Sequence, residues 1–374
     1  MSQSSQVLDR AFTEAKRLCY AGLDEVTLYQ RVTERIQQAV PFDCHCMHTN
    51  DPTSGLITRA VLFDAELANQ SAIYLNRVYF EDEVTPYGWM AEKRLPAITL
   101  SEATGGRPER ALRYHELFTP LGLEHELRGA FALNGELWGT SALMRERGSS
   151  DFTDREVEFF RRIAPHVTAG LRVAALRTEA LAEPAKENTP GVLVLDHKGR
   201  VVQHTWAAEQ WLRDLEDPGQ SWQEGYRLPQ AVVSVAGALQ RALGRGTDRE
   251  RHSIARLLAR TRSGRWVALH GAQSEPSASR ESETTIIIEP ARPRELFWLR
   301  TSAYSLSERE REIVDLVVRG LSTKEISKTL YISEYTVQDH LSNVFEKVGV
   351  RGRRALVKHL YVESLFPQHL EPVR

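Results

Sequence analysis

Apolar residues recur at steps of three and four along three stretches of the chain, and this spacing predicts helices. Residues 7–40 predict two helices, the second of which ends before Pro41. Residues 152–180 carry a longer apolar face and predict one long helix, in which Pro165 is expected to introduce a kink. Residues 307–365 predict four short helices with a serine at the start of the first two.

Short runs of strand length, separated by turn signals, predict strands elsewhere. Residues 42–49 and 56–62 flank a turn-rich segment and predict a hairpin. A second hairpin is expected over 126–144, because Asn134-Gly135 favours the type I′ turn that matches strand twist. A later group of short strands is predicted at residues 191–196, 201–204, 253–260, 266–271 and 284–289. Most of the segment between the two hairpins is weakly periodic.

Length and composition limit the class of protein. The 374 residues predict two or three domains, and 41% hydrophobic with 26% charged residues is ordinary for a globular chain. The formal net charge of −2 argues against a surface coated in basic charge, although it averages over all domains. Three cysteines cannot make a disulfide framework, and no segment reads as a signal peptide or membrane span. We therefore expect a cytoplasmic protein with no membrane partner.

Two upstream segments resemble known sensor modules. The turn at residues 50–56 reads NDPTSGL and is similar to the DP-x-[TS]-G-L turn of GAF modules attached to transcription regulators. Residues 191–202 read GVLVLDHKGRVV and are followed by AAEQWL, which resembles the opening of a PAS domain. These resemblances imply an α+β multidomain chain with GAF-like and PAS-like α/β modules before an all-α C-terminal domain. The expected boundaries are 1–181, a linker at 182–190, 191–293 and 300–374.

Four blocks of the C-terminal segment occur in the order and spacing of a helix-turn-helix domain. They read LSERE at 306–310, GLSTKEI at 320–326, ISEYTVQDHL at 332–341 and NVFEKVGV at 343–350. Two helices joined by a turn of three or four residues place the second helix in the DNA major groove. Together the blocks resemble the LuxR-type DNA-binding domain, also called the LuxR/FixJ or NarL type, with four helices.

The resemblance puts Gln338, Asp339 and Ser342 on the side that faces the groove. Glutamine pairs with adenine, aspartate accepts from cytosine N4, and serine serves either partner, although Asp339 would also repel phosphate. Family members often carry a basic residue where this chain has Gln338, so the bases that are read stay open. The expected phosphate contacts, which position the domain without reading sequence, are Lys324, Thr336, Lys347, Arg351 and Arg353.

Two groups of residues upstream could carry other chemistry. On a strand, Cys44, Cys46 and His48 would share one face and offer soft or borderline ligands to a metal ion, or act in redox sensing. Against this, their spacing is not that of structural zinc sites, and buried cysteines are often small core residues. Aromatic side chains are candidate walls of a ligand pocket or ordinary core: Tyr74, Tyr79, Phe80, Tyr87, Trp89 and Trp138.

These features predict a homodimeric, sequence-specific DNA-binding transcription regulator. Its upstream modules are expected to sense a small-molecule effector or a protein signal, and RNA polymerase is a further candidate partner. The alternatives are a metal- or redox-sensing regulator, or one whose upstream modules only bind a partner protein. Dinucleotide, P-loop, nucleophile-elbow and HExxH motifs are absent, so no cofactor and no enzymatic activity are predicted.

Overall fold

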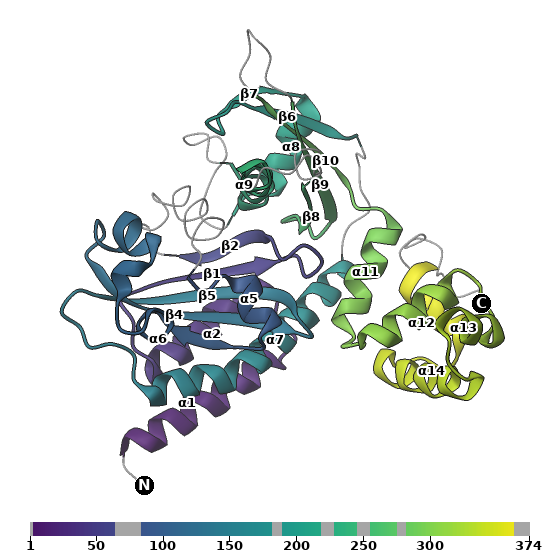
Figure 1. Cartoon of the computed structure of the whole chain (residues 1–374), viewed down its shortest axis with the longest axis horizontal. Coiled ribbons are helices and arrows are strands. Elements are labelled where there is room, and N and C mark those ends of the chain that lie inside the picture. The colour runs from purple at the N-terminus through teal and green to yellow at the C-terminus, as the bar shows by residue number, and fades with distance from the viewer. Residues whose placement is uncertain are drawn as a thin grey trace. The chain divides into compact units, whose positions relative to one another are not determined.

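The computed structural model describes residues 3–63, 84–181, 189–217, 228–244, 255–274 and 282–362. The chain divides into two compact units, Met1–Pro290 and Ala291–Arg374 (Figure 1). The larger unit holds two antiparallel five-stranded sheets, and the smaller unit is helical. Within the described ranges, no helix is long and apolar enough to cross a membrane. The mixed α/β class and the helical C-terminus are confirmed, whereas the four expected domain boundaries and the GAF-like and PAS-like assignments stay predictions.

The first sheet has the strand order β2-β1-β5-β4-β3. Its members are β1 (Cys44–Asn50), β2 (Ile57–Phe63), β3 (Ala97–Thr99), β4 (Leu123–Leu133) and β5 (Glu136–Glu146). Both predicted hairpins are present: β1 pairs with β2, and β4 pairs with β5 through the turn at Asn134 and Gly135. Asn134 has φ of 53° and Gly135 has φ of 83°, as the type I′ turn requires.

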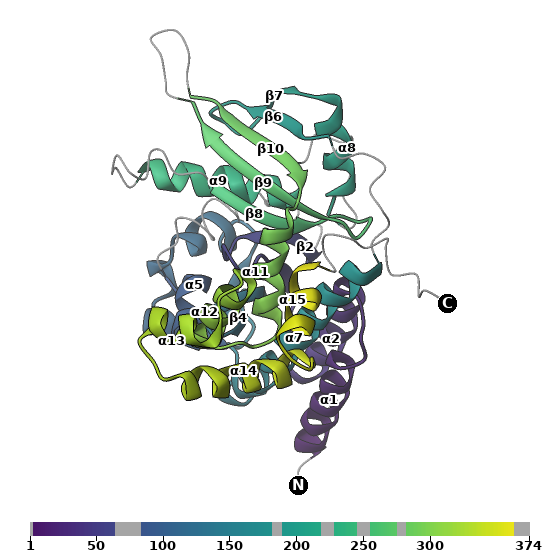
Figure 2. The same ribbon diagram turned by 90° about the vertical axis from the view of Figure 1, so that its right-hand side faces the viewer.

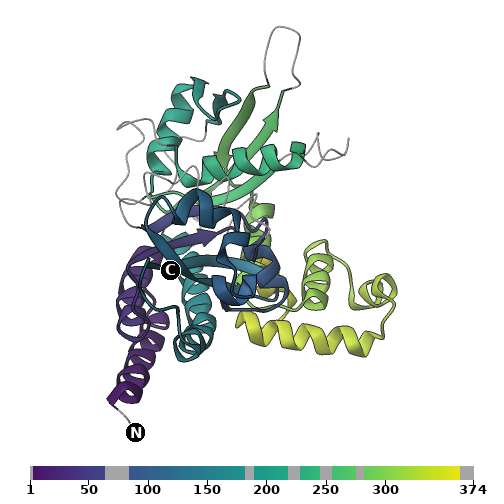
Figure 3. The same cartoon turned by 60° about the vertical axis from the view of Figure 1, so that its left-hand side comes forward.

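Two long helices, α2 (Glu25–Ala39) and α7 (Asp154–Leu181), pack against one face of this sheet, and a third, α1 (Gln3–Cys19), packs against both of them. In Figure 3 the purple helices α1 and α2 run beside the teal helix α7. Glycines allow the close approach, because a Cβ at Gly129 would lie 2.3 Å from the Phe160 ring. A Cβ at Gly139 would lie 2.8 Å from Leu171. The predicted long helix is confirmed, and Pro165 lies inside it.

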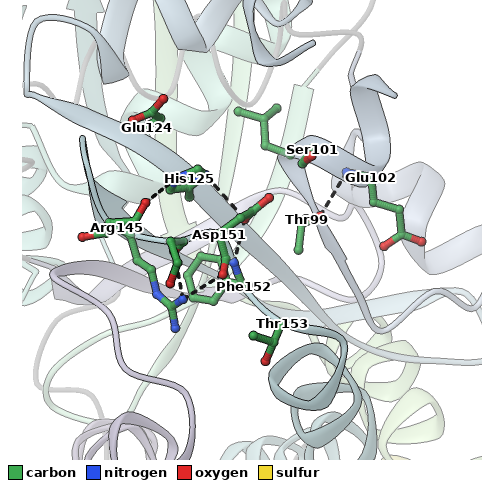
Figure 4. Close-up of polar contacts among 12 residues, drawn as sticks. Thr99, Ser101, Glu102, Glu124, His125, Arg145, Asp151, Phe152 and Thr153 are labelled. Carbon is green, nitrogen blue, oxygen red and sulfur yellow. Dashed lines mark hydrogen bonds and ion pairs between the residues drawn. The ribbon is translucent and has the colours of Figure 1, made fainter. Parts of the chain in front are cut away.

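Arg145 ties the start of α7 to the sheet. Its guanidinium donates to the carbonyl oxygens of Pro41, Ser150 and Asp151 at 2.8–3.1 Å and pairs with Glu156 at 2.6 Å. The same group lies 4.1 Å from the centre of the Phe152 ring, and Figure 4 shows the two side chains together. A buried guanidinium needs several acceptors, and the loop before α7 supplies them.

Short helices cover the opposite face of the first sheet. They are α5 (Tyr87–Glu92), α6 (Leu100–Thr104), the 3-10 turn η2 (Pro108–Arg110) and the π-turn η3 (Tyr114–Phe118). The sequence pattern predicted none of them, because a helix of five or six residues shows too few periods of its apolar face. Residues 64–83, in the same weakly periodic segment, lie outside the described ranges.

The second sheet has the order β7-β6-β10-β9-β8. All five strands were predicted, and the structure gives their bounds as β6 (Gly191–Leu195), β7 (Val201–His204), β8 (Ala255–Arg260), β9 (Trp266–Gln273) and β10 (Thr284–Pro290). Two helices cover one face and share its apolar core: α8 (Trp206–Asp214) and α9 (Gln230–Gly244). A Cβ at Gly191 would lie 2.5 Å from the backbone of Ala208, so α8 can pack closely only against a glycine.

The two sheets meet at their edge strands, β2 and β8, which lie next to each other in both Figure 1 and Figure 2. Each edge gives one backbone N–H to a carboxylate from the other module. Asp217, after α8, accepts from Ala60 of β2 at 2.9 Å, and Asp51, in the first hairpin turn, accepts from Leu258 of β8 at 3.0 Å. These bonds satisfy donors that an edge strand would otherwise leave unpaired.

Buried arginines add to this junction. Glu25 of α2 pairs with Arg59 of β2 and, at 3.1 Å, with Arg260 of β8. Arg59 also donates to the carbonyl oxygen of Arg260 at 2.7 Å, and Arg260 donates to Ala174 of α7 at 3.2 Å. The side chains of this triad are about nine-tenths buried. Breaking a buried pair is costly, so the larger unit is expected to unfold as one body.

The smaller unit contains six helical segments within the described residues. They are α11 (Pro293–Ala303), α12 (Glu308–Val318), α13 (Thr323–Leu330), α14 (Glu334–Val348), α15 (Arg353–Val357) and the π-turn η4 (Lys358–Val362). The four predicted helices correspond to α12, α13, α14 and α15 with η4, whereas α11 was not predicted. Their common core includes Ile313, Ile326, Val337, Leu341 and Leu356.

Asp217 should make the stability of the chain depend on pH. Burial raises the pKa of this carboxyl to about 6, although bonds from Gln230 and Ala60 and the charge of Arg59 oppose the shift. A raised folded-state pKa adds stability that is complete below pH of about 4 and is lost as the pH rises through about 6. We expect the free energy of unfolding in urea to fall across this window.

The Asp217→Asn variant should lack this part of the pH dependence, because an amide does not titrate. It should also be less stable at every pH, since its NH₂ group would face one of the two backbone donors. Identical pH slopes for the wild type and the variant would contradict the assignment.

Candidate nucleic-acid interface

Helices α13 and α14 form the predicted helix-turn-helix, and hydrogen bonds fix the ends of each helix. Ser322 caps α13 in a capping box with Glu325, and Ser333 caps α14 by accepting from the Thr336 N–H at 3.0 Å. The turn between them is residues 331–333, and Gly349 ends α14 in the left-handed conformation. The predicted cap at Ser322 and the predicted turn at residues 331–333 are confirmed, whereas the cap at Ser333 was not predicted.

Helix α12 contacts both α13 and α14. Ser307 and Glu310 form its capping box, and Glu310 also pairs with Lys347 of α14 at 2.6 Å. Burial alone would raise the pKa of Glu310, but the hydrogen bonds from Lys347 and Ser307 outweigh it and hold that pKa below its ordinary value. Arg309 donates to the carbonyl oxygen of Leu330 at 2.7 Å, at the end of α13. One turn of α12 therefore fixes both helices of the motif.

Helix α14 has one buried and one exposed stripe. The buried stripe packs into the core of the unit and consists of Val337, Leu341, Val344 and Val348. At about 100° per residue, the opposite stripe carries Gln338, Asp339 and Ser342, and all three are exposed. The Ser342 hydroxyl donates to the Gln338 carbonyl oxygen at 3.0 Å. The three residues expected to read bases therefore lie together on the free face of the helix, and their contact with DNA stays a prediction.

The five residues expected to contact phosphate differ in their surroundings. Lys324 and Arg351 are exposed, and the Thr336 hydroxyl lies 2.8 Å from that of Ser333. Lys347 is occupied by its ion pair with Glu310, and Arg353 donates to the carbonyl oxygen of Leu321 at 2.7 Å. Substituting Lys347 or Arg353 would therefore also disturb the fold of the unit, a consequence that sequence reasoning missed because both partners lie more than 30 residues away.

The candidate pocket residues lie in different settings. Tyr74, Tyr79 and Phe80 lie outside the described residues. Tyr87 is buried and donates its hydroxyl to Ser141 O at 2.9 Å, whereas Trp89 is 41% exposed. Tyr87 also lies under the guanidinium of Arg128, at 4.9 Å from the ring centre. Trp89 therefore does not line a closed pocket in this structure.

Trp138 is 3% exposed and is the extra residue of a bulge in β5, because Phe131 pairs with Gly139 and Ala132 pairs with Leu137. Its indole N–H is buried and has no hydrogen-bond acceptor within the described part of the chain. A buried donor without a partner is rare in proteins, and bulges re-aim side chains beside functional sites.

A buried charged cluster near Tyr87 was not predicted. Glu126 of β4 accepts from Arg113 Nε at 2.7 Å and from Arg128 Nε at 3.1 Å, and all three side chains are almost fully buried. Both arginines also donate to the backbone at Val84 and Thr85. Glu126 and Arg128 lie two positions apart on β4, so the alternation of side chains along a strand could have predicted that they share one face. Arg113 comes from the weakly periodic segment, and no sequence pattern predicted its contact with Glu126.

The proposed metal site is not supported by the structure. Cys44, Cys46 and His48 do occupy β1, but no group of three His, Cys, Asp or Glu side chains in the described ranges could hold a metal ion. Same-face positions on a strand repeat only every ~6.6–6.8 Å, which is too far for three side chains to share one ion without further convergence. Burial lowers the pKa of His48 to about 3, so this imidazole is neutral.

Comparison with known proteins agrees with the site. A family model described as bacterial regulatory proteins, luxR family, matches residues 304–360. Spore germination protein GerE of Bacillus subtilis is 49% identical over 55 residues, which are 15% of this chain and 74% of GerE. The nitrate/nitrite response regulator protein NarP of Escherichia coli is 42% identical over 65 residues, 17% of this chain and 30% of NarP.

The similarity to solved structures is weak. The crystal structure of the phage VqmA–DPO complex aligns with 47% of this chain. The aligned part is 86% of the chain in that structure, at 16% sequence identity. Its TM-score of 0.26 is too low for any argument about the fold.

A capped helix pair with a free polar stripe on its second helix defines the class of helix-turn-helix DNA-binding proteins. Within that class, the chain belongs to the luxR family of bacterial regulatory proteins, through residues 304–360. It is a DNA-binding transcription regulator of this family.

Val337 should be required for folding of the smaller unit, because its side chain is fully buried between α14 and the core. A Val337→Asp variant would bury an unpaired charge and should melt the unit. Gln338→Asp is the matched control, since it adds the same carboxylate to an exposed neighbour and should leave the melting transition unchanged. A folded Val337→Asp protein, measured by circular dichroism, would contradict the packing described above.

Proposed function

We propose that the chain acts in the cytoplasm as a homodimer whose two α14 helices enter the major groove at neighbouring half-sites, about one helical turn (~34 Å) apart. Gln338, Asp339 and Ser342 read base edges, while Lys324, Thr336 and Arg351 contact phosphate. Lys347 and Arg353 also contact phosphate, while Glu310 and the carbonyl oxygen of Leu321 hold their side chains in place. The observation that carries this proposal is the exposed polar stripe of α14, opposite its buried stripe.

The charge of the whole chain does not oppose DNA binding. The net charge of −2 includes the larger unit, whose acidic side chains Glu25, Asp51, Glu126 and Asp217 are occupied by internal partners. Asp339 lies beside Gln338 on the free stripe, where it can accept from cytosine N4 but repels phosphate. This placement of charges is compatible with residues that read bases at the centre of the stripe and residues that contact phosphate at its flanks.

The upstream unit acts as the sensor in this proposal. Two antiparallel sheets, the first with helices on both faces and the second with helices on one face, are compatible with the GAF-like and PAS-like interpretation. The specific observation in favour of a small-molecule effector is the buried Trp138 indole N–H, which a ligand with an acceptor atom would satisfy. Effector binding would shift the population between two arrangements of the DNA-binding units, and RNA polymerase is a further proposed partner of the bound dimer.

A Gln338→Ala variant should change which base is preferred at one position of the site and cost about 1–3 kcal/mol there. The measurement is selection of bound sites from a randomised DNA pool, with the full-length wild type and variant in parallel. Lys324→Ala is the matched control: it removes an exposed charge at the same motif and should weaken all sequences alike. An unchanged base preference for Gln338→Ala would remove Gln338 from the reading residues.

A Trp138→Phe variant should lose the effector response while keeping its fold, because the substitution removes an N–H that has no acceptor among the described residues. In a thermal-shift screen of small molecules, compounds that raise the melting temperature of the wild type should have less effect on this variant. Trp211→Phe is the control, since the Trp211 N–H already donates to Thr189 O at 3.0 Å. Equal responses in both variants would exclude Trp138 from the site.

If the screen finds no such compound, the result favours the alternative that the upstream modules bind only a partner protein.

A further inference from the structure

Two tyrosines of the smaller unit are almost fully exposed, beside the turn of the helix-turn-helix. Tyr331 is 94% exposed and Tyr335 is 82% exposed, the two highest values among the large hydrophobic side chains that the structure describes as exposed. An exposed ring gains little from packing inside the chain, so neither ring is explained by folding of the unit.

The backbone at Tyr331 sharpens this point. Tyr331 ends α13 in the left-handed region, with φ of 54° and ψ of 43°. Glycine or asparagine adopts this conformation at lower cost than a residue with a bulky side chain. A tyrosine at this position therefore costs conformational free energy and returns no burial, which points to a role outside the folded chain.

Tyr335 continues the free stripe of α14. It lies three, four and seven residues before Gln338, Asp339 and Ser342, so all four side chains share one side of the helix. The buried residues Val337 and Val344 lie on the opposite side. Tyr335 is therefore the N-terminal end of the surface that faces the groove.

Tyr331 similarly follows a basic stripe on α13. Lys324 and Lys328 are exposed and lie seven and three residues before it. Two ammonium groups next to an exposed phenol complement a row of phosphates, whereas they would not favour an apolar protein partner.

We propose that Tyr331 and Tyr335 contact the sugar–phosphate backbone of double-stranded DNA at the border of the groove that α14 enters. Each hydroxyl donates to a phosphate oxygen, and each ring packs on a deoxyribose. This inference rests on the proposed function and adds two neutral contacts to its charged ones. Because a phenol carries no charge, these contacts release no counterion and read no base.

The test compares salt dependence as well as affinity. Full-length wild type, Tyr331→Phe, Tyr335→Phe and Tyr335→Ala are titrated against a mixed-sequence duplex and against a site selected by the wild type, over a range of salt concentrations. Loss of a hydrogen bond to a charged group should weaken binding about tenfold for each Phe variant, equally on both duplexes. The slope of log affinity against log salt should not change, and Tyr335→Ala should weaken binding more.

Matched controls separate this inference from the proposed function. Lys324→Ala should reduce the salt slope by about one unit, as a charged phosphate contact does. Tyr331→Asn suits the left-handed backbone, so it should stay folded by circular dichroism and still lose affinity. This variant excludes unfolding as the cause of weaker binding.

Three outcomes would overturn the inference. Wild-type affinity in the tyrosine variants, with Lys324→Ala behaving as expected, would reject the backbone contact alone and favour docking of a protein. A changed base preference in Tyr335→Phe would place its hydroxyl on a base edge instead. Failure of the wild type to bind either duplex would reject the proposed function together with the inference.

Discussion

Burial of one stripe of α14 is the constraint on which the functional surface depends. Val337, Leu341, Val344 and Val348 fill the core shared with α12 and α13, so the rotation of α14 about its axis is fixed. Once that rotation is fixed, the helical repeat directs Gln338, Asp339 and Ser342 to solvent. The polar face needs no interaction of its own to be held in place, and the three side chains that are expected to read bases remain exposed.

In the larger unit, buried carboxylates join the two sheet modules through hydrogen bonds and ion pairs. Asp217 and Asp51 each accept an N–H from the edge strand of the other module, and Glu25 pairs with an arginine from each sheet. Edge strands are sites of aggregation when they are left open, and these carboxylates close them without a continuous sheet. Polar junctions of this kind are strong only while every member is paired, so a ligand that moved one strand would disturb the whole junction.

Local signals made the C-terminal unit predictable. The serines at 307 and 322 with glutamates three residues later define helix starts, and Gly349 defines an end, so the spacing of the motif is present in the sequence itself. The five strands of the second sheet were equally visible, two of them as apolar runs of strand length at residues 191–195 and 285–288. Helices α5, α6 and η3 were not, since five or six residues span fewer than two turns and show no repeat of an apolar face. Helices α9 and α11 were missed although they are longer. The structure does not support the metal interpretation, because sharing a strand face does not bring three ligand side chains to a common point within the described residues.

The sequence by itself determined the family of the DNA-binding unit, its caps and which side of α14 is apolar, because these depend on residues within a few positions of one another. Only the tertiary structure decided which residues far apart in the sequence pair with one another and which side chains are buried. It paired Glu310 with Lys347 and Arg353 with Leu321, so that expected phosphate ligands also hold the fold. It left the Trp138 N–H buried with no acceptor in the part of the chain that the structure describes, and it left Tyr331 and Tyr335 exposed to solvent. Burial is a property of the packed chain, so no local pattern could have assigned it to these side chains.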